Sequence, residues 1–351
     1  MPRVSAPSDI AHGHAAKRLA ALATPPNALG RLGDLGLWLS ACQGRVPPRE
    51  LDDVRLVIFA GDHGVAAHGV SAFPASITGA MVRMLVAGKA GVSSLARAHG
   101  VSVRVLDLGV DDDFDDLDEA TGAALRAYKV RKGSGAIHAV DALTAEQTRA
   151  ALEAGAKVAR EEINAGGQLL ICGDMGIGNS TPAAALVAAG LGLPASAVAG
   201  RGSGISDDAL NHKIDVIQAA LDRAGSHTAD PIETLTMLGG ADLAATTGYV
   251  LAAAQDGVPV LLDGLASVAC ALTAERIEPG AAAWYAAGHR SAEPAQSLAL
   301  AKLGLEPLLD FSLCLGEGSG AVAALPMVRS AVALLRDVAL FDELPVPSRR
   351  P

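Results

Sequence analysis

Short apolar runs that end in glycine or aspartate recur along this chain, separated by alanine-rich stretches of helical character. The runs lie at 54–62 (VRLVIFAGD), 101–110 (VSVRVLDLGV), 168–176 (QLLICGDMG), 233–240 (ETLTMLGG), 258–264 (VPVLLDG) and 308–316 (LLDFSLCLG). Continuous apolar runs are typical of strands buried on both faces, as in parallel sheets flanked by helices. The pattern therefore predicts an α/β fold with a doubly wound, mostly parallel sheet of about six strands.

The two ends of the chain have a different, purely helical character. Leucines recur at helical spacing over residues 8–46 and are interrupted by Pro25-Pro26, which predicts two helices joined at a break. Residues 327–343 predict one more helix, which we expect to pack beside the first two.

Charge and composition narrow the class of ligand. The net charge of −10 repels polyanions, and an aromatic content of only 3% offers few stacking surfaces, so we expect no nucleic-acid partner. A small anion would have to be held by local geometry instead of by the overall field.

Membrane, secretory and metal-binding features are not apparent. No strongly apolar run of about 18 residues stands out, and the first residues lack the apolar core of a secretory signal. Cys42, Cys172, Cys270 and Cys314 form no CxxC or Cys/His pattern, and Asp62 and His63 form no ligand set with other histidines. We therefore expect buried thiols, a reducing cytoplasm, no membrane and no metal.

Glycine-rich or acidic turns follow the predicted strands. They are 61–64 (GDHG), 173–179 (GDMGIGN), 239–240 (GG), 263–264 (DG) and 316–320 (GEGSG). Ligands of open parallel sheets bind at the carboxyl ends of the strands, where these turns would converge. The sequence thus predicts a ligand site at this edge.

Two of the glycine-rich segments are suited to a phosphate. GDMGIGNST (173–181) opens a helix but has neither the P-loop lysine nor the full GxGxxG spacing, which favours a mononucleotide over ATP or NAD. AGRGSGISDDALNHK (199–213) adds Arg201 and Lys213 as cations. The alternatives are an ordinary glycine-rich turn and a solvated loop.

Glu317 is the candidate base. It lies between two glycines at the end of an apolar run, where burial would raise the pKa of its carboxyl group toward neutrality. The alternative is a turn acid exposed to water. In the segment HRSAEP we expect His289 to be structural and Ser291 to donate to a substrate carboxylate.

Separated blocks over nearly the whole chain resemble the nicotinate-nucleotide:dimethylbenzimidazole phosphoribosyltransferase family. The blocks are TPPNALGRL, IFAGDHGVAAHGVSAFP, CGDMGIGNSTPAAAL, GRGSGI, GGADLAATTG, VPVLLDGLAS, AGHRSAEP and GLEPLLDFSLCLGEGSGA. The resemblance implies a Rossmann-like catalytic domain (50–324), a small helical domain from both ends (1–49 with about 325–351), and a homodimer. It implies transfer of phosphoribosyl from nicotinate mononucleotide to 5,6-dimethylbenzimidazole, giving α-ribazole 5′-phosphate and nicotinate in cobalamin assembly, with no cofactor.

The resemblance also implies roles for particular residues. Glu317 would be the general base. Phosphate and nucleotide binding would fall to Asp174, Gly176, Gly178, Asn179, Gly202, Ser203, Gly204, Lys213, Asp263, Gly264 and Ser291. The acceptor-base pocket would contain Ser71, Phe73, Ala80, Met175 and Leu315.

Departures from the family pattern lie near the base pocket and the nucleotide. Asp174 and Asp242 stand where the family commonly has Glu, Ala75 and Ala80 replace glutamines, and Ala295-Gln296 replaces Gly-His. The acceptor could therefore be a different benzimidazole, adenine or a phenolic base. A non-catalytic nucleotide-binding protein is the competing interpretation, whereas a nicotinamide-dependent dehydrogenase would need the missing GxGxxG turn.

Overall fold

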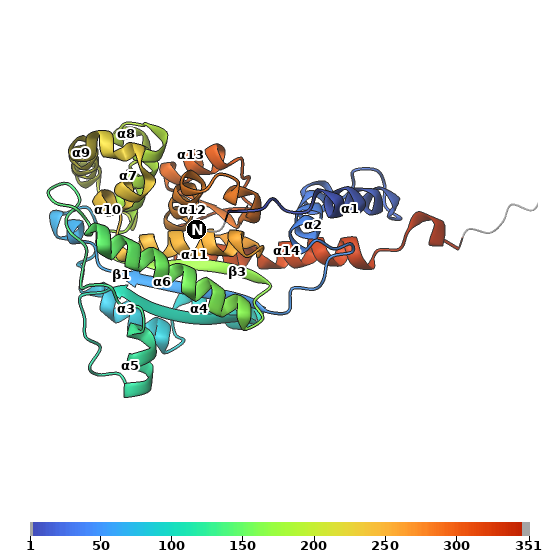
Figure 1. Ribbon diagram of the computed structural model, residues 1–351, viewed down its shortest axis with the longest axis horizontal. Helices are drawn as coiled ribbons and strands as arrows, with labels where there is room; N and C mark the ends of the chain where they lie inside the picture. The colour runs from blue at the N-terminus through green and yellow to red at the C-terminus, as the bar shows by residue number, and fades with distance from the viewer. Residues whose placement is uncertain (1–2, 346–351) are drawn as a thin grey trace, which may run out of the picture.

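A five-stranded parallel sheet forms the centre of the protein, in the computed structural model that describes residues 3–345 (Figure 1). Its strand order is β2-β1-β3-β4-β5, and β6 pairs with β7 in a separate, parallel two-stranded sheet. The strands are β1 (Val54–Gly61), β2 (Val101–Gly109), β3 (Leu169–Met175), β4 (Val260–Leu262), β5 (Tyr285–Ala287), β6 (His289–Ser291) and β7 (Leu309–Leu313).

Helices connect and cover the strands. The α-helices are α1 (Asp9–Ala21), α2 (Gly30–Gln43), α3 (Ile77–Val86), α4 (Gly91–His99), α5 (Glu119–Arg126), α6 (Ala145–Asn164), α7 (Ser180–Leu191), α8 (Ala195–Val198), α9 (Asp207–Ala224), α10 (Pro231–Leu238), α11 (Ala241–Gln255), α12 (Leu265–Ile277), α13 (Pro294–Leu303) and α14 (Ser319–Asp337). Short 3₁₀ turns are η1 (Gly64–His68), η2 (Gly225–Ala229), η3 (Ala281–Trp284) and η4 (Phe341–Glu343).

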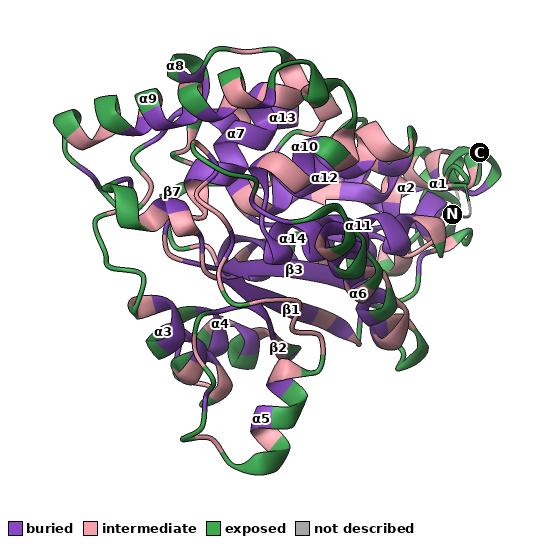
Figure 2. Ribbon diagram, turned by 60° about the vertical axis from the view of Figure 1, so that its left-hand side comes forward, coloured by how far each residue is buried: buried purple, intermediate pink, exposed green. Residues whose placement is uncertain are grey.

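The sheet separates two hydrophobic cores, as expected for strands whose successive side chains point to opposite faces. Val57 and Phe59 of β1 pack with α6, α7, α11 and α12. Leu56 and Ile58 pack on the other face with α3, α4 and α14. The central strands β1, β3 and β4 are therefore buried on both sides, as Figure 2 shows for β1 and β3, and the helices that flank the parallel sheet confirm the predicted α/β class.

The strand order creates a switch point between β1 and β3. The chain passes from β1 to β2 at one side and then crosses back to β3 on the other side of β1. The connections leave in opposite directions there, so a crevice opens at the carboxyl ends of these strands.

The helices of the chain ends pack together. The predicted pair at residues 8–46 is α1 and α2, and both contact α14 at one end of the molecule (Figure 1). Ala15, Leu22 and Leu335 form a small cluster of their own, but Leu35 and Leu39 of α2 belong to the core under the sheet. A small helical domain (1–49 with about 325–351) thus stays a proposal, which α1 supports better than α2.

One predicted strand is wrong, and two short strands, β5 and β6, were missed. Residues 233–240 lie in and just after α10, because Asp230 caps this helix and Pro231 begins it, and these start features outweigh the β propensity of TLTML. The fifth strand is instead β5, whose three residues are too few for a recognisable pattern. The main sheet accordingly has five strands where about six were predicted.

Helix α14 begins earlier than the predicted helix at 327–343 and ends at Asp337. It is the one helix of the described chain that is long and apolar enough to cross a membrane, by length and composition alone. Its apolar positions from Ala321 to Val332 pack against the sheet, which accounts for this composition without a membrane.

Candidate active site

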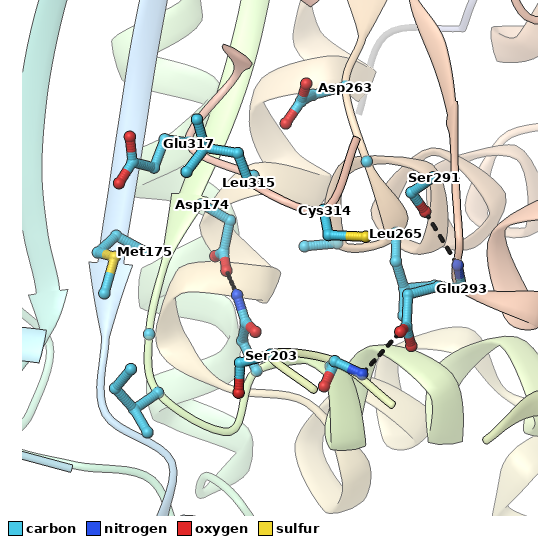
Figure 3. Close-up of a pocket in the computed structure, with 18 of the residues that line it drawn as sticks. Asp174, Met175, Ser203, Asp263, Leu265, Ser291, Glu293, Cys314, Leu315 and Glu317 are labelled. Atoms are coloured by element: carbon cyan, nitrogen blue, oxygen red, sulfur yellow. Dashed lines mark hydrogen bonds between the residues drawn. The ribbon is translucent and has the colours of Figure 1, made fainter. Parts of the chain in front are cut away.

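A cavity of about 480 Å³ opens at the carboxyl ends of β3 and β4 (Figure 3). This volume falls in the range of roughly 300–1,000 Å³ that small-molecule sites occupy. Glu317 and Met175 lie on one side of it, and Ser291 and Glu293 lie on the opposite side. Three of the predicted turns, 173–179, 263–264 and 316–320, contribute lining residues, whereas the predicted turns at 61–64 and 239–240 do not line the cavity.

Most of the predicted site residues lie together at this cavity. Those that line it are Ser71, Phe73, Asp174, Met175, Gly176, Gly178, Asn179, Gly202, Ser203, Asp263, Gly264, Ser291, Leu315 and Glu317. Three others, Ala80, Gly204 and Lys213, are not among the lining residues.

Glu317 is buried at the cavity, with only 4% of its surface exposed. It adopts a left-handed conformation (φ 62°), and its carbonyl packs so closely on β3 that a Cβ at Gly173 would lie 2.3 Å from the Glu317 oxygen. Burial raises the pKa of the carboxyl group, opposed only by the Val92 amide, whose nitrogen is 3.5 Å from Oε2. A base that titrates closer to neutrality is the result.

Asp263 fixes the turn that carries Glu317. Its carboxylate accepts hydrogen bonds from the amides of Gly318 and Ala321, both at 3.0 Å, and its Oδ1 lies 3.4 Å from Nε2 of His289. Burial alone would raise the pKa of Asp263, but His289 and the amides outweigh it and hold the pKa below its usual value. This carboxylate is therefore ionised and engaged in positioning, and the structural role expected for His289 fits the pair.

The two glycine-rich segments meet at one end of the cavity. Gly178 and Gly202 adopt positive φ (85° and 51°), and Ser180 begins α7 between them. The buried Lys213 donates to Oγ of Ser180 and to the carbonyl of Gly200, both at 2.9 Å. Lys213 thus ties the two segments together from behind, and Gly204 lies exposed outside the lining. Arg201 is also exposed and pairs with Asp207.

The other side of the cavity is apolar. Phe73, Met175 and Leu315 line it as predicted, and Phe73 and Leu315 are about half exposed at 50% and 53%. Helix α3 contributes Ile77 and Met81, which lie one turn apart on one face. Ala80 is rotated away from that face and is exposed, so it does not occupy the predicted position in the base pocket.

Cys314 is the one cysteine that departs from the expectation of burial. It is exposed and lines the cavity, because it follows β7, a strand of the small sheet with three exposed residues. The other three cysteines are buried, and all four are free thiols.

A buried charge cluster behind the cavity was not predicted from the sequence. Nε2 of His63 lies 2.9 Å from Oδ2 of Asp242, and Asp174 lies beside them with its Oδ2 accepting from Nδ2 of Asn179 at 2.5 Å. Burial and the negative charge of Asp242 raise the pKa of Asp174 well above its usual value. His63 instead lowers the pKa of Asp242, so Asp242 is the stronger acid of the two carboxyl groups.

The position of His63 could have pointed to this cluster. It lies two residues after the end of β1, at the switch point and in the turn GDHG, but the sequence pattern was interpreted only in terms of metal binding. Glycines surround it: a Cβ at Gly240 would lie 2.8 Å from Cε1 of His63, and one at Gly176 would lie 3.1 Å from Nε2. Glu293 is a second residue whose part in the site was missed.

Comparison with known proteins agrees with this architecture. A family model described as "Phosphoribosyltransferase" matches residues 4–346. The chain is 50% identical over 350 residues to nicotinate-nucleotide–dimethylbenzimidazole phosphoribosyltransferase of Mycobacterium avium (strain 104), covering 99% of each chain. It is 49% identical over 346 residues to the protein of the same name from Mycobacterium tuberculosis (strain ATCC 25618 / H37Rv), covering 99% of this chain and 94% of the relative. The crystal structure of CobT from Thermus thermophilus superposes with a TM-score of 0.90 at 42% identity, covering 95% of this chain and 98% of that one.

Proposed function

Because the chain belongs to the nicotinate-nucleotide–dimethylbenzimidazole phosphoribosyltransferase family, we propose that it transfers phosphoribosyl from nicotinate mononucleotide to 5,6-dimethylbenzimidazole or a related base. The products would be nicotinate and α-ribazole 5′-phosphate, the nucleotide needed for cobalamin assembly. One observation supports this most: a buried glutamate with a raised pKa lies in the same cavity as two glycine-rich segments suited to a phosphate.

The glycine-rich end of the cavity would bind the donor. Backbone amides at the start of α7 and at residues 202–203 suit a 5′-phosphate, whereas the amides of Asn179 and Gly204 already donate to the carbonyls of Gly176 and Arg201. Lys213 would contribute positive charge from behind Ser180 without lining the cavity itself. Ser291, which lines the cavity on the side opposite Glu317, would donate a hydrogen bond to the nicotinate carboxylate.

Departure of nicotinate needs little assistance. Nicotinate joined through its ring nitrogen is already cationic, so the C1–N bond breaks with its electron pair passing to that nitrogen. Positive charge then develops on the ribosyl carbon, and the nearby carboxylate of Glu317 would stabilise it. Holding both reactants in one cavity supplies much of the remaining acceleration.

The apolar side of the cavity would bind the flat acceptor base. A ring nitrogen of the base attacks C1, and the proton of its N–H passes to the carboxylate of Glu317. Asp263 keeps the Glu317 turn in place through the amides of Gly318 and Ala321. No step in this scheme requires a metal or a cofactor.

An assay for nicotinate release separates this function from its competitor. With nicotinate mononucleotide and a set of bases (5,6-dimethylbenzimidazole, benzimidazole, adenine and a phenol), we expect nicotinate and the corresponding nucleotide to form in equal amounts. The preferred base identifies the acceptor, which the altered segment 71–81 leaves open. A protein that binds the nucleotide but releases no nicotinate with any base would be a non-catalytic binding protein.

We further propose a homodimer that works in the cytoplasm. Phe73 and Leu315 at the cavity and Phe311 in β7 are large apolar side chains exposed by 50–71%, which supports an association surface on this part of the molecule. Four free thiols suit a reducing compartment.

A further inference from the structure

A carboxylate already occupies one amide of the glycine-rich loop. Glu293 is the N-cap residue of α13, but its side chain makes no capping bond to its own helix. It reaches across to residues 200–204 instead, where the amide of Gly202 donates to Oε1 at 2.8 Å (Figure 3).

The carboxylate lies directly against the loop backbone. A Cβ at Gly200 would lie 2.2 Å from Oε2 of Glu293, so glycine at this position lets the side chain approach the backbone closely. Yet Oε2 is buried and accepts no hydrogen bond in the described part of the chain. A buried, unsatisfied carboxylate oxygen carries a free-energy cost, and such groups call for an explanation.

Lys213 lies on the other side of the same loop. Its Nζ donates to the carbonyl of Gly200 and lies 3.7 Å from the position of a Cβ at Gly202. Burial lowers the pKa of Lys213, and the charge of Glu293 opposes that effect. The loop therefore lies between the buried ammonium group of Lys213 and the carboxylate of Glu293. The negative charge of Glu293 partly balances the positive charge of Lys213.

We propose that Glu293 is a resident anion of the phosphate site, which holds the Gly202 amide while the site is empty and is displaced from it by the donor's 5′-phosphate. This inference rests on the proposed function, which places the phosphate at this loop. Carboxylate and phosphate oxygens accept the same N–H hydrogen bond, so the loop can keep its shape through the exchange.

The exchange has a consequence for affinity. Two anions cannot share one amide, and each repels the other at short distance. Glu293 therefore lowers phosphate affinity while it keeps the loop formed. The nucleotide product carries the same 5′-phosphate as the donor, so the returning carboxylate would also favour release of the product.

The test is calorimetric binding to wild type and Glu293→Gln of three probes: inorganic phosphate, nicotinate mononucleotide, and the riboside that lacks the phosphate. Glutamine keeps an oxygen for the Gly202 amide but removes the charge. We expect the two phosphate-bearing probes to bind about fivefold more tightly to the variant, the order of effect of one nearby like charge. Affinity for the riboside should not change.

Glu275→Gln is the matched control. Its carboxylate also accepts from a glycine amide, Gly280 at 3.0 Å, but it does not line the cavity, so phosphate affinity should stay at the wild-type value. As a second measurement, phosphate should raise the unfolding temperature of Glu293→Gln more than that of wild type.

The possible failures are distinct. Unchanged or weaker phosphate binding by Glu293→Gln would overturn the resident-anion role and leave the proposed function intact, because Glu293 would then be only a loop anchor. A wild-type protein that binds the riboside and the nucleotide equally would overturn both, since the loop would then not be a phosphate site.

Discussion

Asp263 shows how much of the site depends on a single side chain that does no chemistry in the proposed reaction. The family resemblance implied a nucleotide-binding role for it, and the strand pattern predicted its place at the ligand edge of the sheet. In the structure its oxygens hold the first turn of α14 and face His289. Its place at the cavity could be predicted from the strand pattern, but its role could not, because its partners are 26 or more residues away.

We predict that Asp263→Asn lowers the free energy of unfolding by about 3 kcal/mol near pH 6, because it leaves a buried His289 cation without its partner. The pKa of Asp263 is lowered in the folded state, so its contribution is present above the unfolded value near 3.8 and is lost as the pH falls through the folded pKa. The pKa of His289 is raised, so its part is present below about 6.5 and is lost as the pH rises through the folded pKa.

Urea unfolding of both proteins at several pH values measures this difference. It should be largest between about pH 4 and pH 6.5 and should shrink on either side. A difference that does not vary with pH would show that the lost amide bonds, and not the ion pair, carry the effect.

Other residues mark where sequence reasoning succeeded and failed. Glu317 was identifiable because glycines flank it at the end of an apolar run. The pairing of His63 with Asp242 was not, because residues 179 positions apart in sequence meet only through the fold. Ala80 was misplaced because helix α3, and not the motif alone, decides which side chains face the cavity.

At the scale of elements, α6 and α11 are held unusually close by two glycines. A Cβ at Gly155 of α6 would lie 1.8 Å from the carbonyl oxygen of Ala245, and one at Gly248 of α11 would lie 2.1 Å from that of Leu152. At each glycine, the backbone of the other helix lies in the space that a side chain would fill. The two helices cover one face of the sheet beneath the site.

We predict that Gly155→Ala lowers the free energy of unfolding by at least about 2 kcal/mol, because the added methyl group must push the two backbones apart. Gly13→Ala in α1 is the control, since nothing lies within 4 Å of its Cβ position and alanine favours a helix. Thermal unfolding measures both. A Gly155→Ala protein as stable as wild type would mean that the helices can separate without cost.

Elements themselves were predictable where the apolar run was long. The strands β1, β2 and β3 were found to within one residue at each end, since seven to nine consecutive strand residues leave a clear pattern. The helix α10 was not predicted, because the β-forming residues TLTML suggested a strand at 233–240. The helix-start features Asp230 and Pro231 precede that segment. Strand β5 was not predicted either, because it has only three residues and forms through its pairing with β4.

At the scale of the whole molecule, the strand order brings the separate turns to one cavity. The sequence predicted that the turns would share an edge, since all carboxyl ends of a parallel sheet do. It did not predict the order β2-β1-β3-β4-β5, which places the switch point beside His63 and Asp174. Strand order depends on crossovers that leave little trace in local sequence.

The central claim is that Glu317 takes the proton of an acceptor base in this cavity, and its direct test is the rate of nicotinate release by wild type and Glu317→Gln across about pH 5 to pH 8. Wild type should speed up as Glu317 loses its proton, with a midpoint above the usual value of 4.5, because burial raises the pKa. Glu317→Gln should bind the donor normally, lose about 10²- to 10⁴-fold in rate, and lose that pH dependence. A variant with the wild-type rate, or with the same midpoint, would contradict the account.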